Sequence, residues 1–261
     1  PIITVNNPSS DVSTENAVPF DVSIVDSLPT YGFVDWDDSL VGWWRAEGNA
    51  NDESPYANHG TFVGDAHIVD NGKFGKAFSL DGAGDVVDIG DKDGFDFHHT
   101  DSFTISVWVY KADISERGIL SKGRSFTLHY NGYRWQFTLD GHYVYVDEQN
   151  PQDRWIHLAV VYDASVPSLS MYVDGQYKAG GTVNGITDFS NTNHLGIGMG
   201  KYGGIEHKGL IDEVVIFKRA LLESEIKALY GITGNSFITT YAELTEYTTH
   251  TYQLHVVNSN A

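Results

Sequence analysis

The segment 51–60, NDESPYANHG, gathers oxygen-bearing groups within one short loop. Asp52 carries a carboxylate, Asn58 an amide oxygen and Gly60 a backbone carbonyl. Such hard oxygen ligands suit Ca²⁺, which binds about six to eight of them at about 2.3–2.6 Å. The loop lacks a partner carboxylate nearby in sequence. The alternative interpretation is a loop of ordinary turn residues.

Residues 209–217, GLIDEVVIF, read as an apolar strand that Asp212 interrupts. A carboxylate at such a position has to be satisfied by a metal ion, by backbone N–H donors or by solvent. Asp212 is therefore either a metal ligand or a structural residue that is hydrogen-bonded to the backbone.

A second set of side chains could bind sugars, which proteins recognise by stacking on aromatic faces and by a few polar groups. Candidates of both kinds occur at loop or outward positions of residues 126–146 and their neighbours. They are His129, Arg134, Gln136, His142, Tyr143, Tyr145, Tyr202 and His207. The alternative for each residue is an inert surface position. Most tryptophans are better explained as core residues.

The spacing of acidic residues does not predict catalysis. Retaining glycosidases need two carboxyl groups about 5–5.5 Å apart. The closest pairs are Glu223 with Glu225, on a predicted helix, and Asp212 with Glu213, on opposite faces of a predicted strand. The sequence also lacks the Gly-x-Ser-x-Gly elbow of many hydrolases and the His-x-x-x-His spacing of zinc sites. We therefore expect a protein that is not an enzyme.

The elements that must position these residues are mostly β-strands. Residues 126–146 predict a three-stranded meander, with turns at Asn131-Gly132 and Asp140-Gly141. Alternating patterns predict further strands at 103–110, 155–163, 169–179, 194–200 and 209–217. Residues 220–230 alone have helical spacing. Many short strands with one late helix predict an all-β, two-sheet antiparallel sandwich.

The two ends of the chain differ from the middle in composition. Residues 1–38 and 235–261 are rich in Ser, Asn and Thr and contain alternating apolar residues. One interpretation is a small immunoglobulin-like β-sandwich that is split by the insertion of residues 39–234. The alternative is a set of linking or edge strands that a neighbouring chain or domain completes.

The charge of the chain restricts its partners. It has 35 acidic and 16 basic residues, a net charge of −19 and no cysteine. Polyanion binding needs clustered Lys and Arg, so nucleic acid and anionic membranes are excluded as partners, and calcium or neutral glycans are favoured. No segment approaches the roughly 18 apolar residues of a membrane span, which predicts a soluble chain. The start at Pro1 predicts a removed signal peptide or excision from a longer protein.

Several segments, taken in order, resemble the laminin-G-like, concanavalin A-like lectin and glucanase superfamily. They are SLVGWWRAEGNANDESPYANHGTFVG (39–64), GKFGKAFSLDGAGDVVDIGD (72–91), SFTISVWVYKAD (102–113), RWIHLAVVYD (154–163), LSMYVDGQ (169–176) and GLIDEVVIFKRALLESEIKALYG (209–231). The resemblance implies a jelly roll for residues 39–234 that serves in carbohydrate binding or adhesion. Residues 237–261 resemble the closing strands of immunoglobulin-like repeats in prokaryotic surface proteins.

The resemblance also implies roles for particular residues. In similar jelly rolls the Asp at the position of Asp212 closes a calcium site with the early Asp-rich loop, here at Asp52. Related hydrolases carry Glu-x-Asp-x-x-Glu on one strand, and this chain has no such string. Similar sequences have Ser before the helix, where this chain has Leu222. A missing cap costs about 0.5–2 kcal/mol unless a neighbour replaces it.

The sequence thus predicts a non-catalytic extracellular or cell-surface module with structural calcium. Its partners would be a glycan or another cell-surface ligand, together with neighbouring domains or subunits of a larger surface protein. The alternative is a structural subunit of a cell-surface or filament assembly that uses its terminal strands for intersubunit contacts. The ligand itself cannot be named, because one scaffold supports many binding functions.

Overall fold

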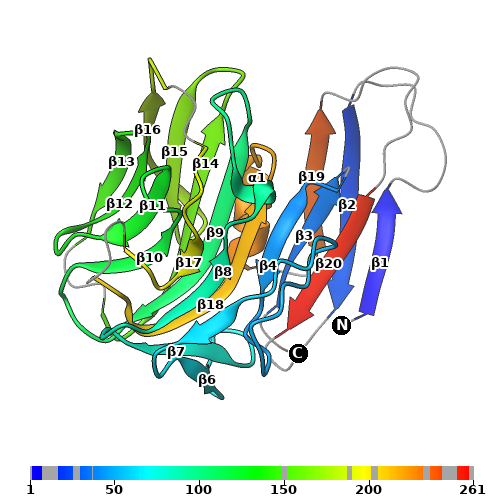
Figure 1. Cartoon of the computed structure of the whole chain (residues 1–261). Helices are drawn as coiled ribbons and strands as arrows, with labels where there is room; N and C mark the ends of the chain where they lie inside the picture. The colour runs from blue at the N-terminus through cyan, green and yellow to red at the C-terminus, as the bar shows by residue number, and fades with distance from the viewer. Residues whose placement is uncertain are drawn as a thin grey trace.

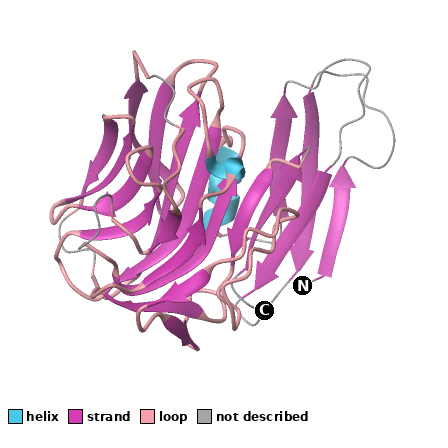
Figure 2. Cartoon of the chain, viewed as in Figure 1, coloured by secondary structure: helices cyan, strands magenta, loops and turns pink. Residues whose placement is uncertain are grey.

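The computed structural model of the chain describes residues 2–7, 17–25, 30–36, 38–148, 152–186, 190–200, 205–231, 236–242 and 252–258. Figure 1 shows two large sheets packed face to face and a smaller group of strands beside them, which holds both ends of the chain. Strands dominate the described residues, and the single α-helix there, α1 (Glu223–Tyr230), lies between the large sheets and the smaller group (Figure 2). No helix in these residues is long and apolar enough to cross a membrane.

One large sheet contains seven antiparallel strands in the order β13-β12-β11-β10-β17-β8-β5. Their bounds are β5 (Thr61–Val63), β8 (Val86–Gly90), β10 (Arg117–Ser121), β11 (Phe126–Tyr130), β12 (Arg134–Leu139), β13 (His142–Asp147) and β17 (Leu195–Ile197). Strand β13 stands at one end of this order, beside β12.

The other large sheet has the order β16-β15-β14-β9-β18-β7-β6, and β4 also pairs with β18. Its strands are β4 (Leu40–Trp44), β6 (His67–Val69), β7 (Ala77–Asp81), β9 (Phe103–Lys111), β14 (Trp155–Asp163), β15 (Ser168–Val173), β16 (Gln176–Thr182) and β18 (Lys208–Phe217). A short 3₁₀ turn, η1 (Asp93–Phe95), precedes β9.

The main core fills the space between the two large sheets. Phe103 from β9 packs against Phe126 and Phe137 from the opposite sheet, with ring centroids 6.0 and 6.2 Å apart. Trp44 and Trp135 are fully buried in the same cluster. Alternation along each strand produces this core, because every second side chain points inward. The predicted all-β jelly-roll sandwich is therefore confirmed.

The meander turns show how the local sequence sets the strand register. Asp140 and Gly141 both have positive φ, at 44° and 81°, as the predicted two-residue turn requires. The turn at Asn131 differs from its prediction, because β12 begins only at Arg134 and the connection is longer. There the Asn131 Oδ1 accepts the backbone N–H groups of Tyr133 and Arg134 at 3.3 and 3.2 Å. This side-chain acceptor replaces the two-residue turn.

The terminal strands pair with each other within the chain. Strand β2 (Ala17–Val25) lies between β1 (Ile2–Asn7) and β19 (Ser236–Ala242), and β3 (Thr30–Trp36) pairs with β20 (Tyr252–Asn258). The two ends of the chain thus supply strands to one another, as the first interpretation of the sequence required. That these strands form an immunoglobulin-like unit stays a prediction.

A second core joins the terminal strands to the jelly roll. Phe33 of β3 packs edge-on against Trp43 and Phe217 of the eight-stranded sheet, with centroids 5.2 and 5.4 Å apart. Ile226 and Leu229 of α1 are buried in the same cluster. The helix therefore fills the corner between β3 and the outer face of the eight-stranded sheet.

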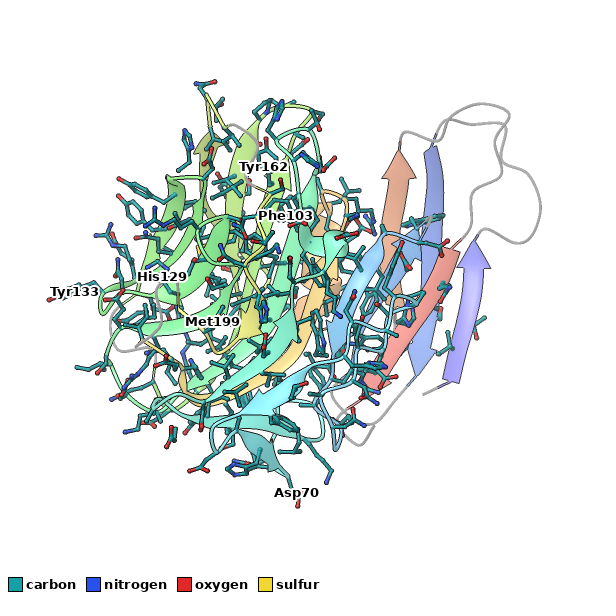
Figure 3. All side chains as sticks on the ribbon, viewed as in Figure 1. Asp70, Phe103, His129, Tyr133, Tyr162 and Met199 are labelled. Atoms are coloured by element: carbon teal, nitrogen blue, oxygen red, sulfur yellow. The ribbon has the colours of Figure 1, made fainter. Side chains whose placement is uncertain are left out.

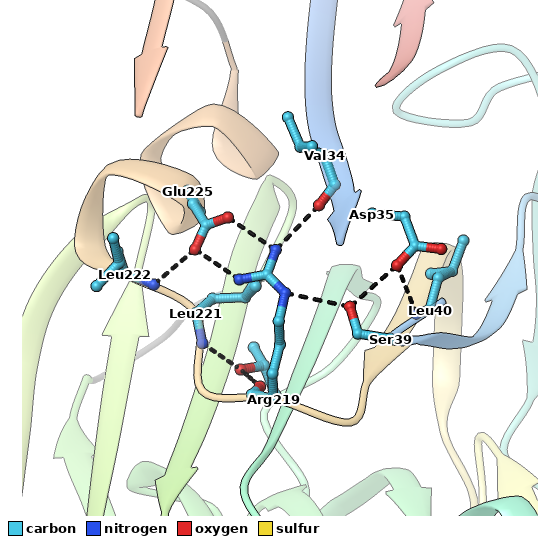
Figure 4. A network of polar contacts seen from close by, with 9 residues as sticks. Val34, Asp35, Ser39, Leu40, Arg219, Leu221, Leu222 and Glu225 are labelled. Carbon is cyan, nitrogen blue, oxygen red and sulfur yellow. Dashed lines mark hydrogen bonds and ion pairs between the residues drawn. The ribbon is translucent and has the colours of Figure 1, made fainter. Parts of the chain in front are cut away.

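A buried ion pair reinforces this junction (Figure 4). The Arg219 guanidinium donates two hydrogen bonds to the Glu225 carboxylate, at 2.8 and 2.7 Å, and one to the Val34 carbonyl at 2.9 Å. Its Nε donates to Ser39 Oγ at 3.1 Å. Glu225 Oε2 also accepts the Leu222 N–H at 2.9 Å, which is the reciprocal bond of a capping box, while Leu222 itself supplies no side-chain cap to α1. One arginine thus connects strand β3 to the helix.

Candidate functional site

Five of the predicted sugar-binding residues meet on the outer face of β11, β12 and β13. The antiparallel register places His129 beside Gln136, and Gln136 beside Tyr145. Arg134 and Tyr143 share this face, because side chains two residues apart on a strand point the same way. The alternate residues of β12, Trp135 and Phe137 among them, enter the core. We call the outward set His129, Arg134, Gln136, Tyr143 and Tyr145 the tyrosine face.

Two exposed tyrosine rings form the most accessible part of the tyrosine face. The side chains of Tyr143 and Tyr145 are 60% and 39% exposed, and such large exposed rings are candidates for ligand contact. Their ring centroids lie 6.1 Å apart with an interplanar angle of 31°. The two rings therefore form a strip along β13 and do not face each other across a pocket.

An arginine holds the second ring in place. The Arg134 guanidinium carbon lies 4.0 Å from the Tyr145 ring centroid, and Arg134 Nε lies 3.2 Å from Asp147 Oδ1. A cation over an aromatic face contributes about 0.5–1 kcal/mol at an exposed site. The pair with Asp147 also neutralises the charge of Arg134 beside the tyrosines.

A row of uncharged polar groups runs beside the tyrosine rings. Asn131 Nδ2 donates to Gln136 Oε1 at 3.2 Å, and Gln136 Nε2 donates to Thr138 Oγ1 at 3.2 Å. In the sheet register Gln136 lies opposite Tyr145, and Thr138 lies opposite Tyr143. Each exposed ring therefore has a hydrogen-bonding side chain as its cross-strand neighbour. Figure 3 shows His129 over this part of the sheet, with Tyr133 projecting from the turn before β12.

The remaining three sugar-binding candidates do not join the tyrosine face. His142 lies on the inward side of β13, in line with the buried Val144, and its Nε2 lies 2.8 Å from the Asn184 carbonyl. His207 is fully buried with its Nε2 3.1 Å from the Tyr110 carbonyl, and burial lowers its pKa to about 3. The prediction of His207 as an outward residue is therefore wrong. Tyr202 lies outside the described residues.

The predicted calcium ligands of the early loop are engaged in other contacts. Both oxygens of the buried Asp52 carboxylate accept hydrogen bonds, from the N–H groups of Trp43, Ser54 and Asn58 and from the Ser54 hydroxyl, at 2.7–2.9 Å. The Asn58 amide donates to the Val41 carbonyl at 3.0 Å. Gly60 packs so closely that an added Cβ would lie 2.6 Å from Val87. In this arrangement both oxygens of the Asp52 carboxylate are satisfied by protein donors, so Asp52 offers no open oxygen to a cation.

Asp212 has a different environment. Its Oδ2 accepts the N–H groups of Lys73 and Phe74 at 2.8 and 2.9 Å, whereas its buried Oδ1 has no hydrogen-bond partner. Burial and the neighbouring Glu213 carboxylate raise the pKa of Asp212 well above its usual range. The described residues contain no group of three or more His, Asp or Glu side chains that could hold a metal ion. The predicted calcium site therefore stays a prediction, and Asp212 is the one predicted ligand with an open carboxylate oxygen.

Glu213 forms a buried polar cluster next to Asp212. Tyr31 and the Trp43 indole donate to its Oε2, the indole at 2.7 Å, and Arg45 Nε lies 3.4 Å from its Oε1. Burial raises the pKa of Glu213 to about 7, even though the Arg45 cation and these hydrogen bonds lower it. Because Tyr31 lies on β3, the cluster ties the terminal strands to β18.

Sequence reasoning missed three residues around the tyrosine face. Asn131 and Thr138 orient the Gln136 amide, and Asp147 pairs with Arg134. The sequence does allow the Asp147 contact to be predicted. The turn at Asp140-Gly141 pairs Leu139 with His142. The same register then places Arg134 opposite Asp147. The sequence contains no comparable signal for the Asn131 contact, because it depends on the longer turn.

The family of the chain follows from its sequence. A laminin G model of the concanavalin A-like lectin/glucanases superfamily matches residues 81–227, more than half of the chain. The chain belongs to this superfamily. No curated protein matches the chain.

Several solved structures share the fold. Domain 4 of AbnA, an extracellular arabinanase of Geobacillus stearothermophilus solved in complex with arabinotriose, is 22% identical with a TM-score of 0.58, over 74% of this chain and 98% of that one. The binding domain of Paraclostridial Mosquitocidal Protein 1 is 17% identical with a TM-score of 0.61, over 74% of this chain and 52% of that one. The botulinum neurotoxin serotype G binding domain is 16% identical, with a TM-score of 0.61 and coverages of 73% and 50%. The chain thus spans about half the length of the toxin domains.

Proposed function

We propose that this chain is a non-catalytic, extracellular module that binds a glycan on the tyrosine face. The observation that carries the proposal is the strip of two exposed tyrosine rings, each with a hydrogen-bonding side chain opposite it in the sheet register. Sugars present apolar C–H faces and hydroxyl groups at once, so an aromatic surface next to fixed amide and hydroxyl groups suits them.

The comparisons support this proposal at the level of the fold. The similar structures are binding domains of toxins and a domain of an extracellular arabinanase that was solved with a sugar. The acidic residues considered for catalysis have structural contacts. Glu225 binds Arg219, and Glu223 lies 2.6 Å from Lys227. Asp212 accepts backbone N–H groups with its Oδ2, and Glu213 accepts the Trp43 indole. For the alternative, a filament subunit joined by its terminal strands, the structure offers less support, because β19 and β20 pair within the chain.

The proposal predicts that both exposed tyrosines are needed for glycan binding. We expect the wild type to bind oligosaccharides on a glycan array and Tyr143→Ala/Tyr145→Ala to lose most of that signal, because tyrosine is enriched among the hot-spot residues whose truncation costs about 2 kcal/mol or more. The matched control is Tyr177→Ala, which removes a ring of similar exposure, 50%, from β16 of the other sheet. Equal binding by the wild type and the double variant, or no binding by the wild type, would contradict the proposal.

We also propose that a structural calcium ion binds through Asp212. The support is the buried Asp212 Oδ1, which has no hydrogen-bond partner, and the Glu47 carboxylate, which is near enough to raise the Asp212 pKa further. A cation would supply positive charge to this buried carboxylate. Asp52, by contrast, is satisfied by four protein donors.

The calcium proposal predicts a chelator-dependent stability. We expect EDTA to lower the melting temperature of the wild type, because an ion at one hundred times its Kd stabilises the fold by about 2.7 kcal/mol. Asp212→Asn should abolish the response to EDTA, whereas Asp52→Asn should lower the melting temperature equally with and without EDTA. Identical melting of the wild type in calcium and in EDTA would count against the site.

A further inference from the structure

The arrangement of the tyrosine face also restricts the kind of glycan that fits it. Tyr143 and Tyr145 are two residues apart on β13, the last strand in the order of its sheet. Two such residues are separated by about 7 Å along a strand, and the ring centroids lie 6.1 Å apart. One sugar ring cannot stack on both tyrosine rings at that separation. A chain of sugars running along β13 can contact both.

Polar side chains lie next to the tyrosine rings. Gln136 lies opposite Tyr145 and forms a subsite with that ring, whereas Thr138, opposite Tyr143, is buried and orients the Gln136 amide. The hydrogen bonds from Asn131 to Gln136 and from Gln136 to Thr138 fix the orientation of the amides before a ligand arrives. A side-chain amide has two N–H donors. The two contacts use one N–H of Asn131 and one N–H of Gln136. Prior orientation reduces the entropy that binding costs.

The charges around the subsites favour an uncharged ligand. The groups that flank the rings, Asn131, Gln136 and Thr138, are neutral, and the nearby Arg134 is paired with Asp147 at 3.2 Å. The chain as a whole carries a net charge of −19, which repels anionic glycans. Asp147 therefore lowers the expected affinity for acidic sugars, because it neutralises the Arg134 cation that would attract them.

We propose that the tyrosine face binds a neutral, linear glycan along β13 over at least two sugar residues, and that the Arg134–Asp147 pair sets its preference for neutral over acidic chains. This inference rests on the proposed glycan-binding function. It adds the charge of the ligand, its minimum length and its direction.

The test is isothermal titration of the whole chain with neutral trisaccharides, arabinotriose, xylotriose, cellotriose and maltotriose, with the corresponding monosaccharides and with trigalacturonate. We expect at least one neutral trisaccharide to bind about tenfold or more tighter than its monosaccharide and than trigalacturonate, a difference of about 1.4 kcal/mol. Asp147→Asn should raise the affinity for trigalacturonate severalfold relative to that neutral trisaccharide.

Asp70→Asn is the matched control, because it makes the same change of charge at a side chain 87% exposed and paired with Lys76 at 2.6 Å. Figure 3 shows Asp70 at the lower end of the molecule, far from His129.

Equal changes in the affinity for trigalacturonate in Asp147→Asn and Asp70→Asn would overturn the role of the Arg134–Asp147 pair. Equal affinity for monosaccharide and trisaccharide, or tighter binding of trigalacturonate by the wild type, would overturn the neutral linear ligand while the proposed function stands. No binding of any of these sugars, or binding that Tyr143→Ala/Tyr145→Ala leaves unchanged, would overturn the proposed function itself.

Discussion

Replacing His157 with glutamine is expected to make the fold much less sensitive to acid. His157 of β14 is fully buried, its Nε2 lies 2.8 Å from Ser106 Oγ, and its Nδ1 has no hydrogen-bond partner. Burial, with a smaller effect of the Lys73 cation, lowers its pKa from 6.5 to about 3. The folded state therefore keeps a neutral ring at a pH where the unfolded state takes up a proton.

The sign and size of the effect follow from this difference in proton binding. Stability is lost as the pH falls from 6.5 towards 3, by about 1.4 kcal/mol for each pH unit. Between about pH 7 and about pH 4, the wild type should lose about 3 kcal/mol more free energy of unfolding than His157→Gln. Glutamine keeps a polar group towards Ser106 but does not titrate. Urea unfolding across this pH range measures the difference.

Other buried groups also titrate between about pH 7 and about pH 4, but the wild type and His157→Gln share them. The raised pKa of Glu213, about 7, works in the opposite direction, because the folded state takes up that proton first and gains stability as the pH falls towards 4.5. The comparison with the variant removes this contribution. His98→Gln is the control, because the side chain of His98 is exposed. If the curves of His157→Gln and the wild type run parallel, His157 does not stay neutral in the folded state.

Arg219→Met should destabilise the chain by about 3–5 kcal/mol, because it leaves a buried carboxylate without its cation. The Glu225 side chain is 3% exposed and receives two hydrogen bonds from Arg219. The substitution also removes the donors to the Val34 carbonyl and to Ser39. We therefore expect the junction between β3 and α1 to loosen first, which amide hydrogen exchange would detect in residues 30–36.

The same helix supplies a matched control for Arg219. Glu223 and Lys227 form an exposed i,i+4 ion pair on α1, and such pairs contribute about 0.3–0.5 kcal/mol. Lys227→Met should therefore change the free energy of unfolding only slightly. Adding Glu225→Leu to Arg219→Met should recover part of the loss, since no unpaired charge then remains. If Arg219→Met costs no more than Lys227→Met, the buried pair does not hold the junction.

The sequence predicted the parts of the fold that depend on neighbouring residues. Alternation along 126–146 placed Trp135 and Phe137 in the core, and the Asp140-Gly141 turn set the register that aligns Gln136 with Tyr145. The same alternation excludes His142, which is next to Tyr143 and so must face the other way. A strict use of the two-residue period would therefore have removed His142 from the candidates.

Contacts between distant residues could not be predicted from one sequence. Arg219 reaches Val34 across a separation of 185 residues, and Glu213 binds Tyr31 across 182. His207 is buried and its ring contacts the Tyr110 carbonyl on a different strand, a contact that no local sequence pattern predicts. Asp52 is an intermediate case, because its bonds to Ser54 are a local turn feature, whereas its bond to Trp43 depends on the arrangement of the strands.

The central claim is that a glycan binds on the tyrosine face. The most direct test is a crystal structure of the chain soaked with the neutral trisaccharide that binds most tightly in titration. The account predicts sugar density along β13, with one sugar ring stacked on Tyr143 and the next on Tyr145, and with a hydroxyl hydrogen-bonded to the Gln136 amide. Sugar density on another surface of the jelly roll, with both tyrosine rings uncovered, would contradict it.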